Sequence, residues 1–257
     1  MITAAAMLFH GPEQPLERVE LPVPRLNRGE VLVRVQACTI CGSDLHTAHG
    51  RRKVAVPTIL GHEILGRIVE FGPHAVRYDA ADKPLHVDDR VTWAIVANCG
   101  ECFYCRRGLP AKCERGIKFG HQQLGPDNGL TGGLAEYCVL PQGTSLFRVP
   151  DELPDEVACP ANCATATVAA VLEAAGSVVE RNVLVVGAGM LGLTACSMAS
   201  LDGASAVVCC DLAATRRQRA LDFGATAVAS PAERASLVAD TTRGYGVDAG
   251  LELSGST

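Results

Sequence analysis

The sequence lacks any long uninterrupted apolar run and any run of charge of one sign, and aromatic residues make up only 4% of it. No apolar stretch reaches the roughly 20 residues that cross a bilayer. The short apolar opening at residues 1–6 has no basic residues before it, unlike an export signal. The net charge of −5 is spread along the chain, which argues against nucleic acid or an anionic membrane as a partner. We therefore predict a cytoplasmic protein that binds neither.

The sequence does have enough length and apolar content to bury a proper core. Its 257 residues are 48% hydrophobic and 20% charged, which is typical of one large or two ordinary globular domains. Its 12 cysteines are many for an intracellular chain of this size. A secreted disulfide scaffold would normally be shorter and carry an export signal, so metal binding is the better explanation. Cys196, Cys209 and Cys210 lie in apolar surroundings and are expected to be small core residues.

The pattern of apolar residues changes near Leu153. Before it, β-branched runs bounded by turn residues predict strands, and the frequent turns indicate a barrel-like β domain. These strands are expected at 31–37, 66–71, 89–93 and 135–139. From Asp155 onward, alanine-rich helical stretches alternate with short apolar strands, which is typical of βαβ units and a parallel sheet. We expect one domain over residues 1–153 and a second over 154–257.

Four cysteines are clustered within fifteen residues, with the spacing Cys99-x2-Cys102-x2-Cys105-x7-Cys113. Thiolates spaced in this way can converge on one tetrahedral zinc ion and close its coordination sphere. A closed site has no open position for a substrate, so its role would be structural. An iron–sulfur cluster and four unrelated cysteines are the alternatives.

A second set of metal-binding side chains is less compact. Cys41 is followed about twenty residues later by the pair His62 and Glu63, which together offer a thiolate, an imidazole and a carboxylate. A catalytic zinc ion needs about three protein ligands and one free position for water or substrate. By themselves these residues are weak evidence for a metal site.

The order of these motifs resembles the zinc-dependent medium-chain alcohol dehydrogenases. The chain shows Cys41-Gly-Ser-Asp-x-His46, then Gly61-His-Glu63, and then the four-cysteine segment. The resemblance implies a GroES-like β-barrel catalytic domain followed by a Rossmann domain. It implies two zinc ions per chain and hydride transfer between an alcohol or polyol, or its carbonyl form, and a nicotinamide cofactor. A zinc-free quinone reductase and a chaperonin-like barrel are disfavoured, because neither needs these zinc motifs.

The resemblance also assigns roles to residues around the catalytic zinc. It implies Cys41, His62 and Cys163 as ligands, with Glu63 either a ligand or an adjacent carboxylate. Asp44 would hold the other ring nitrogen of His62. The family pattern implies that a hydroxyl at Ser43 receives the proton of the bound alcohol, and that His46 ends the proton relay through the cofactor ribose. His121 matches no family role and is expected to be an ordinary histidine.

A dinucleotide-binding fingerprint follows the apolar strand expected at 182–186. It reads Gly187-Ala-Gly189-Met190-Leu191-Gly192 and leads directly into a helical stretch. Its glycines permit a tight turn, close approach to the pyrophosphate and close helix packing, and the helix N-terminus faces the phosphates. Asp211 ends the next strand nineteen residues after Gly192, where a carboxylate binds the ribose hydroxyls. Asp211 favours NAD over NADP, although Arg216 lies close by.

The second domain shows fewer strands than the family pattern. Four are expected, at 183–187, 206–211, 225–229 and 247–253, whereas a full doubly wound sheet has six. The sequence thus predicts an incomplete Rossmann sheet that lacks the strands of the family's dimer contact, although the family leads us to expect a homo-oligomer. A truncated, non-catalytic fragment that binds zinc and nucleotide is the alternative function. Residues 8–12 onward also look like a subgroup associated with phosphonate metabolism.

Overall fold

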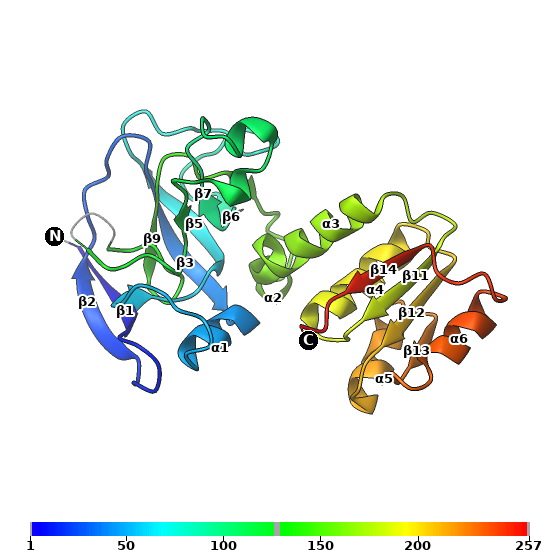
Figure 1. The fold of residues 1–257 in the computed structure, drawn as a ribbon. Helices are drawn as coiled ribbons and strands as arrows, with labels where there is room; N and C mark the ends of the chain where they lie inside the picture. The colour runs from blue at the N-terminus through cyan, green and yellow to red at the C-terminus, as the bar shows by residue number, and fades with distance from the viewer. Residues whose placement is uncertain (1, 126–128, 256–257) are drawn as a thin grey trace. The chain divides into compact units, whose positions relative to one another are not determined.

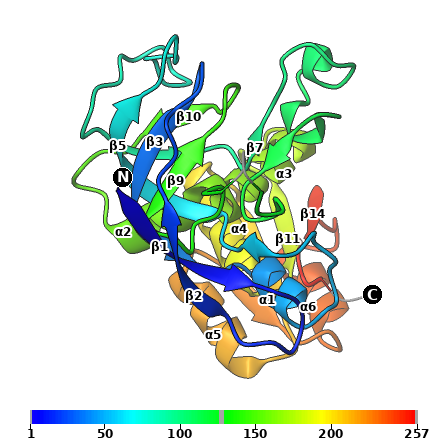
Figure 2. The same cartoon turned by 90° about the vertical axis from the view of Figure 1, so that its left-hand side faces the viewer.

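Strands dominate the chain up to Cys163, which is the first of two compact units. The computed structural model describes residues 2–125 and 129–255. A five-stranded antiparallel sheet has the order β10-β6-β5-β3-β9; β6 is labelled in Figure 1 and β10 in Figure 2. Its members are β3 (Val31–Thr39), β5 (Glu63–Phe71), β6 (Arg90–Trp93), β9 (Tyr137–Leu140) and β10 (Leu146–Arg148). All four strands predicted for this region form within a few residues of their expected bounds.

A smaller sheet covers part of the same core. It has the order β2-β1-β4 and consists of β1 (Thr3–Phe9), β2 (Glu17–Pro22) and β4 (Thr58–Ile59). Alternate side chains of β1 are buried, as a period of two residues per repeat requires. The amide of Met7 in β1 donates to the carbonyl of Leu134, just before β9, so the two sheets are joined. The predicted barrel-like β domain is confirmed.

A lobe interrupts the barrel between β7 (Val96–Ala97) and β8 (Ile117–Lys118), which pair with each other. Between them the chain forms two short 3-10 turns, η1 (Cys105–Arg107) and η2 (Pro110–Lys112). Figures 1 and 2 both show this lobe extending away from the barrel strands. It has little apolar core of its own, since Cys102 is its one buried side chain between β7 and β8 among those described.

The first unit ends ten residues later than the boundary expected at Leu153. Helix α2 (Asp155–Ala158) and the 3-10 turn η3 (Cys159–Asn162) pack on the barrel, where Ala158 and Cys159 lie against Leu65. The buried Arg90 of β6 also donates to the carbonyl oxygens of Pro150 and Leu153. The sequence pattern changes where the chain becomes helical, near Leu153. The boundary between the units lies later, because α2 and η3 pack on the barrel.

The second unit begins at Ala164 and is built on a four-stranded parallel sheet of order β13-β12-β11-β14 (Figure 1). The strands are β11 (Asn182–Val186), β12 (Ala206–Cys210), β13 (Ala227–Ala229) and β14 (Ala249–Glu252). In chain order this is 3-2-1-4, the first part of the doubly wound order. Prediction and structure agree on the Rossmann-like sheet.

The described part of this unit, residues 164–255, contains four helices: α3 (Ala164–Ala175), α4 (Met190–Leu201), α5 (Ala214–Asp222) and α6 (Arg234–Thr241). Helix α3 packs along α4, which covers β11 and β12, while α5 and α6 contact β12 and β13. The core between them contains Cys196 and Cys209, which are buried as expected, as is Cys210.

No single helix within the described ranges is long and apolar enough to cross a membrane; Asp155–Asn162 and Ala164–Ala175 pass that test only when the bent pair is taken together.

Candidate active site and metal centres

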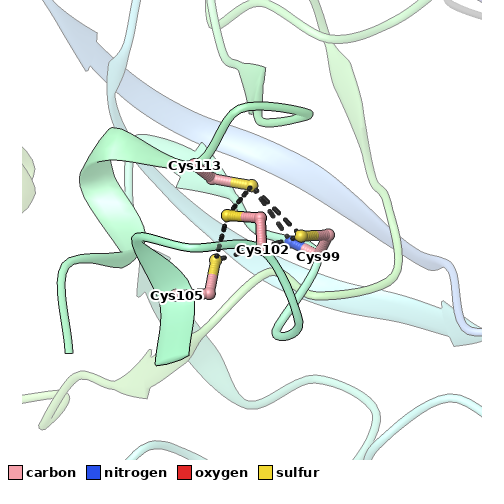
Figure 3. A group of neighbouring side chains, drawn as sticks. All are labelled: Cys99, Cys102, Cys105 and Cys113. Atoms are coloured by element: carbon pink, nitrogen blue, oxygen red, sulfur yellow. Dashed lines mark hydrogen bonds between the residues drawn. The ribbon is translucent and has the colours of Figure 1, made fainter. Parts of the chain in front are cut away.

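The four cysteines of the lobe point toward one another (Figure 3). The Sγ–Sγ distances are 3.5 Å for Cys102–Cys105 and Cys99–Cys113, and 4.0 Å for Cys99–Cys105 and Cys102–Cys113. Zinc–sulfur bonds of about 2.3 Å in a tetrahedron place the sulfurs about 3.8 Å apart. A disulfide would need about 2.05 Å, and all four cysteines are free. The cluster therefore has the donor set and spacing of a closed zinc site.

Backbone and arginine donors surround the sulfur atoms of this cluster. The amide of Cys99 donates to Cys113 Sγ at 3.3 Å, and the guanidinium of Arg115 donates to Cys99 Sγ at 3.5 Å and to Glu101 at 2.6 Å. Backbone N–H groups of Glu101 and Cys102 lower the pKa of Cys99 to about 6. A lowered pKa favours the thiolate, which is the form that binds metal. The lobe thus prepares at least one sulfur as an anion.

A second cluster forms within the first unit from three separate parts of the chain. Cys41 caps the N-terminus of α1 (Gly42–Ala48), His62 and Glu63 stand at the start of β5, and Cys163 follows η3. One donor atom from each of these four residues lies within 4.8 Å of the others. The two sulfurs are 3.9 Å apart. The structure brings together all four residues that the sequence resemblance implies for the catalytic zinc.

Asp44 has two roles around this cluster. Its Oδ2 accepts a hydrogen bond from the Cys41 amide at 3.0 Å, which completes a capping box at the start of α1. Its Oδ1 lies 3.2 Å from His62 Nδ1, an ion-pair distance without the geometry of a hydrogen bond. The ring nitrogen that remains, Nε2, lies 3.3 Å from Ser43 Oγ. Asp44 therefore fixes both a backbone turn and the orientation of His62.

The charges of the cluster are strongly coupled. Burial opposes protonation of His62, but contacts with Asp44 and Cys41 raise its pKa to about 9. The thiol of Cys163, together with the His62 ring, lowers the pKa of Cys41 to about 2, while Cys41 raises the pKa of Cys163. Burial raises the pKa of Glu63. The cluster concentrates donors that a bound cation would hold in their deprotonated forms.

Three supporting residues could not be found from the sequence pattern. Thr39 Oγ1 donates to Glu63 at 2.6 Å. The side-chain amide of Asn162 donates to the carbonyl oxygens of His62 and Trp93, each at 2.9 Å, and so ties η3 to the barrel. The His121 ring lies 5.6 Å from the His62 ring. Each of these residues is recognised only by its contact with a residue far away in the chain, and a single sequence does not show such contacts.

The expected end of the proton relay lies outside the cluster. Ser43 and His46 both lie on α1, three residues apart and therefore on one face of the helix. Ser43 is half-buried beside His62, whereas His46 is exposed. The structure thus separates the two residues along one helical turn, with Ser43 at the cluster and His46 at the solvent.

The glycine-rich turn joins β11 to α4 as the fingerprint requires. Gly187 has φ +96°, which favours glycine, and a Cβ on Gly192 would lie 1.7 Å from the Gly187 carbonyl oxygen. A Cβ on Gly189 would meet nothing within 4 Å, so the approach to the turn is open. Gly189 is also the N-cap residue of α4. The Met190 side chain is exposed and Leu191 packs on the core, so these two residues offer a ligand their backbone amides at the helix N-terminus.

Asp211 stands directly after β12 at the edge of this turn. Its two carboxylate oxygens accept from the amides of Ala188 and Ala213, each at 2.8 Å. These bonds overcome the effect of burial and lower the pKa of Asp211. Arg216 lies 4.0 Å from Asp211, and Arg217 instead donates to the carbonyl oxygens of Asp211 and Leu212. The turn presents a fixed negative charge with one exposed arginine beside it.

The barrel with its thiolate–imidazole cluster, the cysteine lobe and the parallel sheet with its glycine turn are together the features of an oxidoreductase of the alcohol dehydrogenase type. Residues 27–151 match the family model of the alcohol dehydrogenase GroES-like domain. The chain belongs to the zinc-dependent medium-chain alcohol dehydrogenase family.

Relatives support this assignment along nearly the whole chain. An L-threonine 3-dehydrogenase of Pyrococcus furiosus is 34% identical over 98% of this chain and 69% of its own length. The crystal structure of an alcohol dehydrogenase from Thermotoga maritima superposes with a TM-score of 0.93 at 29% identity, over 100% of this chain and 72% of that one. A zinc-binding dehydrogenase of Sinorhizobium meliloti 1021, solved with NADP bound, gives a TM-score of 0.81 at 27% identity, over 100% and 71% of the two chains.

Proposed function

We propose that this protein is a zinc-dependent alcohol dehydrogenase that moves hydride between a small alcohol or polyol, or its carbonyl form, and NAD. The observation that carries the proposal is the convergence of Cys41, His62, Glu63 and Cys163 within 4.8 Å. Two thiolates, one imidazole and a carboxylate match the donor set of a catalytic zinc ion. When bound, zinc would polarise the substrate oxygen and the nicotinamide would exchange hydride with the carbinol carbon.

Ser43 is the residue that we assign to the substrate proton. Its hydroxyl can accept and donate, and it lies 3.3 Å from a ring nitrogen of the proposed ligand His62. His46 stands at the exposed end of the same helical face. We assign Ser43 to receive the proton at the site and His46 to release it to solvent, because an imidazole ring can both accept and donate a proton.

The cysteine lobe serves stability in this proposal. Cys99, Cys102, Cys105 and Cys113 would hold a second zinc ion with no open coordination position. A lobe with so little apolar core needs such a cross-link to keep its shape. The expected content is therefore two zinc ions per chain.

The choice of NAD rests on Asp211. Each of its oxygens still has a lone pair beyond its bond to a backbone amide, and two ribose hydroxyls could donate to them. A 2′-phosphate at the same place would be repelled by this carboxylate. Arg216, in contrast, favours NADP, since an exposed arginine can accommodate a phosphate. One relative was also solved with NADP bound. NADP is thus the second choice.

The test is turnover by zinc-loaded protein, with a panel of alcohols and polyols and with NAD and NADP in parallel. We expect reduction of NAD that depends on the alcohol. Zinc and nucleotide binding without any turnover would support the alternative, a non-catalytic fragment. The named relatives, an alcohol and a threonine dehydrogenase, favour neither that alternative nor a role in phosphonate metabolism. The cytoplasmic location and homo-oligomeric state stay predictions.

A further inference from the structure

Two basic side chains near the proposed catalytic cluster, Arg52 and Lys118, are partly buried. Arg52 is half-buried, while Arg51 and Lys53 on either side of it are exposed. Lys118, at the end of β8, is also half-buried. Burying cationic side chains is unfavourable unless a counter-charge is near. The partial burial of both positive charges therefore needs an interaction that offsets its cost.

Arg52 is attached to the helix that begins at the cluster. Its backbone amide donates to the carbonyl oxygen of His46 at 3.1 Å, so it follows directly on the end of α1. The same helix starts at Cys41 and carries Ser43. Arg52 is therefore held one short helix away from the proposed metal ligand.

Lys118 begins a second segment that contacts the proposed cluster. Its carbonyl oxygen accepts from the amide of His121 at 3.2 Å, and the His121 ring lies 5.6 Å from that of His62. A Cβ on Gly120 would lie 2.7 Å from the carbonyl oxygen of Gly61, so the two backbones touch. The chain from Lys118 to His121 thus forms a wall beside the proposed metal ligand His62.

The segments that follow the two cations are bonded to each other. The amide of Leu124 donates to the carbonyl oxygen of Pro57 at 2.7 Å. Thr58 Oγ1 donates to the carbonyl oxygen of Gln122 at 2.6 Å, and the Gln123 side chain donates to Val56 at 2.8 Å. The loop after Arg52 and the loop after Lys118 therefore form one structure.

Among the described residues, neither cation has a carboxylate partner. Across residues 2–125 and 129–255, no carboxylate lies within 4.0 Å of Arg52 or Lys118. Burial and the charge of Arg52 lower the pKa of Lys118, while the charges of Cys163 and Cys41 act in the opposite direction. Arg52 and Lys118 are therefore near enough for their charges to repel each other.

We propose that Arg52 and Lys118 form an anion subsite, and that the substrate alcohol carries a carboxylate or phosphate group close to its carbinol carbon. An arginine fork and a lysine ammonium are the side chains that recognise such groups. The anion would add a negative charge beside both cations, while the hydroxyl group of the same molecule reaches Ser43 and the cluster. The substrate class named here rests on the proposed dehydrogenase function.

Matched substrate pairs test the subsite on zinc-loaded protein. The pairs are 3-hydroxybutyrate with its uncharged amide, and 1,2-propanediol 1-phosphate with 1,2-propanediol. We expect Arg52→Gln and Lys118→Gln each to lower kcat/KM for the charged member of a pair by about tenfold to a hundredfold, the loss of one charge-assisted hydrogen bond. The uncharged members should change less than about twofold. Arg51→Gln and Lys53→Gln, on exposed residues of the same loop, are the matched controls, and Arg52→Lys should recover part of the loss.

Calorimetric titration of the same charged compounds separates this inference from the proposed function. Selective loss of anion binding in Arg52→Gln, with no turnover of any alcohol by the wild type, would support the subsite and refute the dehydrogenase. Turnover with equal effects of the variants on charged and uncharged alcohols would refute the subsite alone. Weaker NAD binding with unchanged anion binding would also refute it, because the cations would then serve the cofactor. Preference for the carboxylate or for the phosphate identifies the anion, and either supports the inference.

Discussion

Cys41 Sγ and Cys163 Sγ lie 3.9 Å apart although 122 residues separate them in the chain. Cys41 lies at the start of α1 and Cys163 at the end of η3, so each thiol is positioned by the end of a helical element. Asn162, the neighbour of Cys163, is bonded to the carbonyl oxygens of His62 and Trp93. The position of Cys163 therefore depends on a contact between η3 and the barrel.

Asn162→Ala should loosen one metal site and leave the other unchanged. Without the amide, η3 loses its two bonds to the barrel and Cys163 is held less firmly. Supporting contacts of this kind are worth about tenfold to a hundredfold in metal affinity. Competition with a chelator should show one zinc ion released at a lower chelator concentration. Simultaneous loss of the zinc ion of the lobe would contradict the assigned role, because Asn162 does not touch the four lobe cysteines.

Variants of the two clusters should lose different zinc ions, with different effects on stability and activity. Wild-type protein should contain close to two zinc ions. Cys102→Ser or Cys105→Ser should remove one of them and lower the melting temperature, since metal binding and folding are coupled in the lobe. Cys41→Ser or His62→Ala should remove the other ion and the activity, and leave most of the stability. Elemental analysis with thermal unfolding measures both.

A cysteine outside both clusters provides the control for these measurements. Cys210→Ala changes a buried cysteine of β12 in the second unit and should keep both zinc ions. One ion or none in carefully prepared wild-type protein would show that a proposed site does not bind zinc.

Ser43→Ala should impair proton transfer without loss of zinc. A positioned proton acceptor contributes about a hundredfold to ten-thousandfold, so kcat should fall by a factor in this range. Ser43→Thr keeps the hydroxyl and should retain most of the activity. Steady-state kinetics beside zinc analysis gives the answer. Equal activity of the alanine variant would remove Ser43 from the mechanism.

Asp211→Ala should narrow or reverse the preference for NAD over NADP. The change removes the charge that would repel a 2′-phosphate and leaves Arg216 in place. Fluorescence titration with NADH and NADPH measures the ratio of the two dissociation constants. Asp222→Ala, on an exposed residue at the end of α5, should keep the wild-type ratio. Equal binding of both cofactors by the wild type would refute the role of Asp211.

Two glycines of the same turn should respond differently to alanine. Gly192→Ala places a methyl group 1.7 Å from the Gly187 carbonyl oxygen, so the turn must shift and the second unit should lose stability. Gly189→Ala meets no protein atom within 4 Å and should fold normally. Its methyl group would stand where the pyrophosphate approaches and should weaken NAD binding. Amide hydrogen exchange and NADH titration distinguish these effects, and a fully stable Gly192→Ala would show that the turn can relax.

Features set by neighbouring residues could be predicted from the sequence alone. The four lobe cysteines lie within fifteen residues, so a few tight turns suffice to bring their sulfurs together. The strand, glycine turn and helix around Gly187 follow from local apolar pattern and from glycine's freedom at positive φ. The apolar pattern predicted β3, β5, β6 and β9 of the first unit and the four described strands of the second, but not β1, β2, β4 or β10. The resemblance of the ordered motifs implied the arrangement of the domains and the proposed roles of distant residues such as Cys163.

Tertiary structure alone decided the features that join distant segments. Nothing near Asn162 in the sequence shows that its amide reaches the carbonyl oxygen of His62, or that α2 and η3 pack on the barrel rather than on the second unit. The pairing of the loops after Arg52 and Lys118 is equally invisible, and so is the half-burial of these two cations without a carboxylate partner among the described residues. A hydrogen bond or a charge contact depends on distance in space, and only the folded barrel fixes that distance between residues so far apart along the chain.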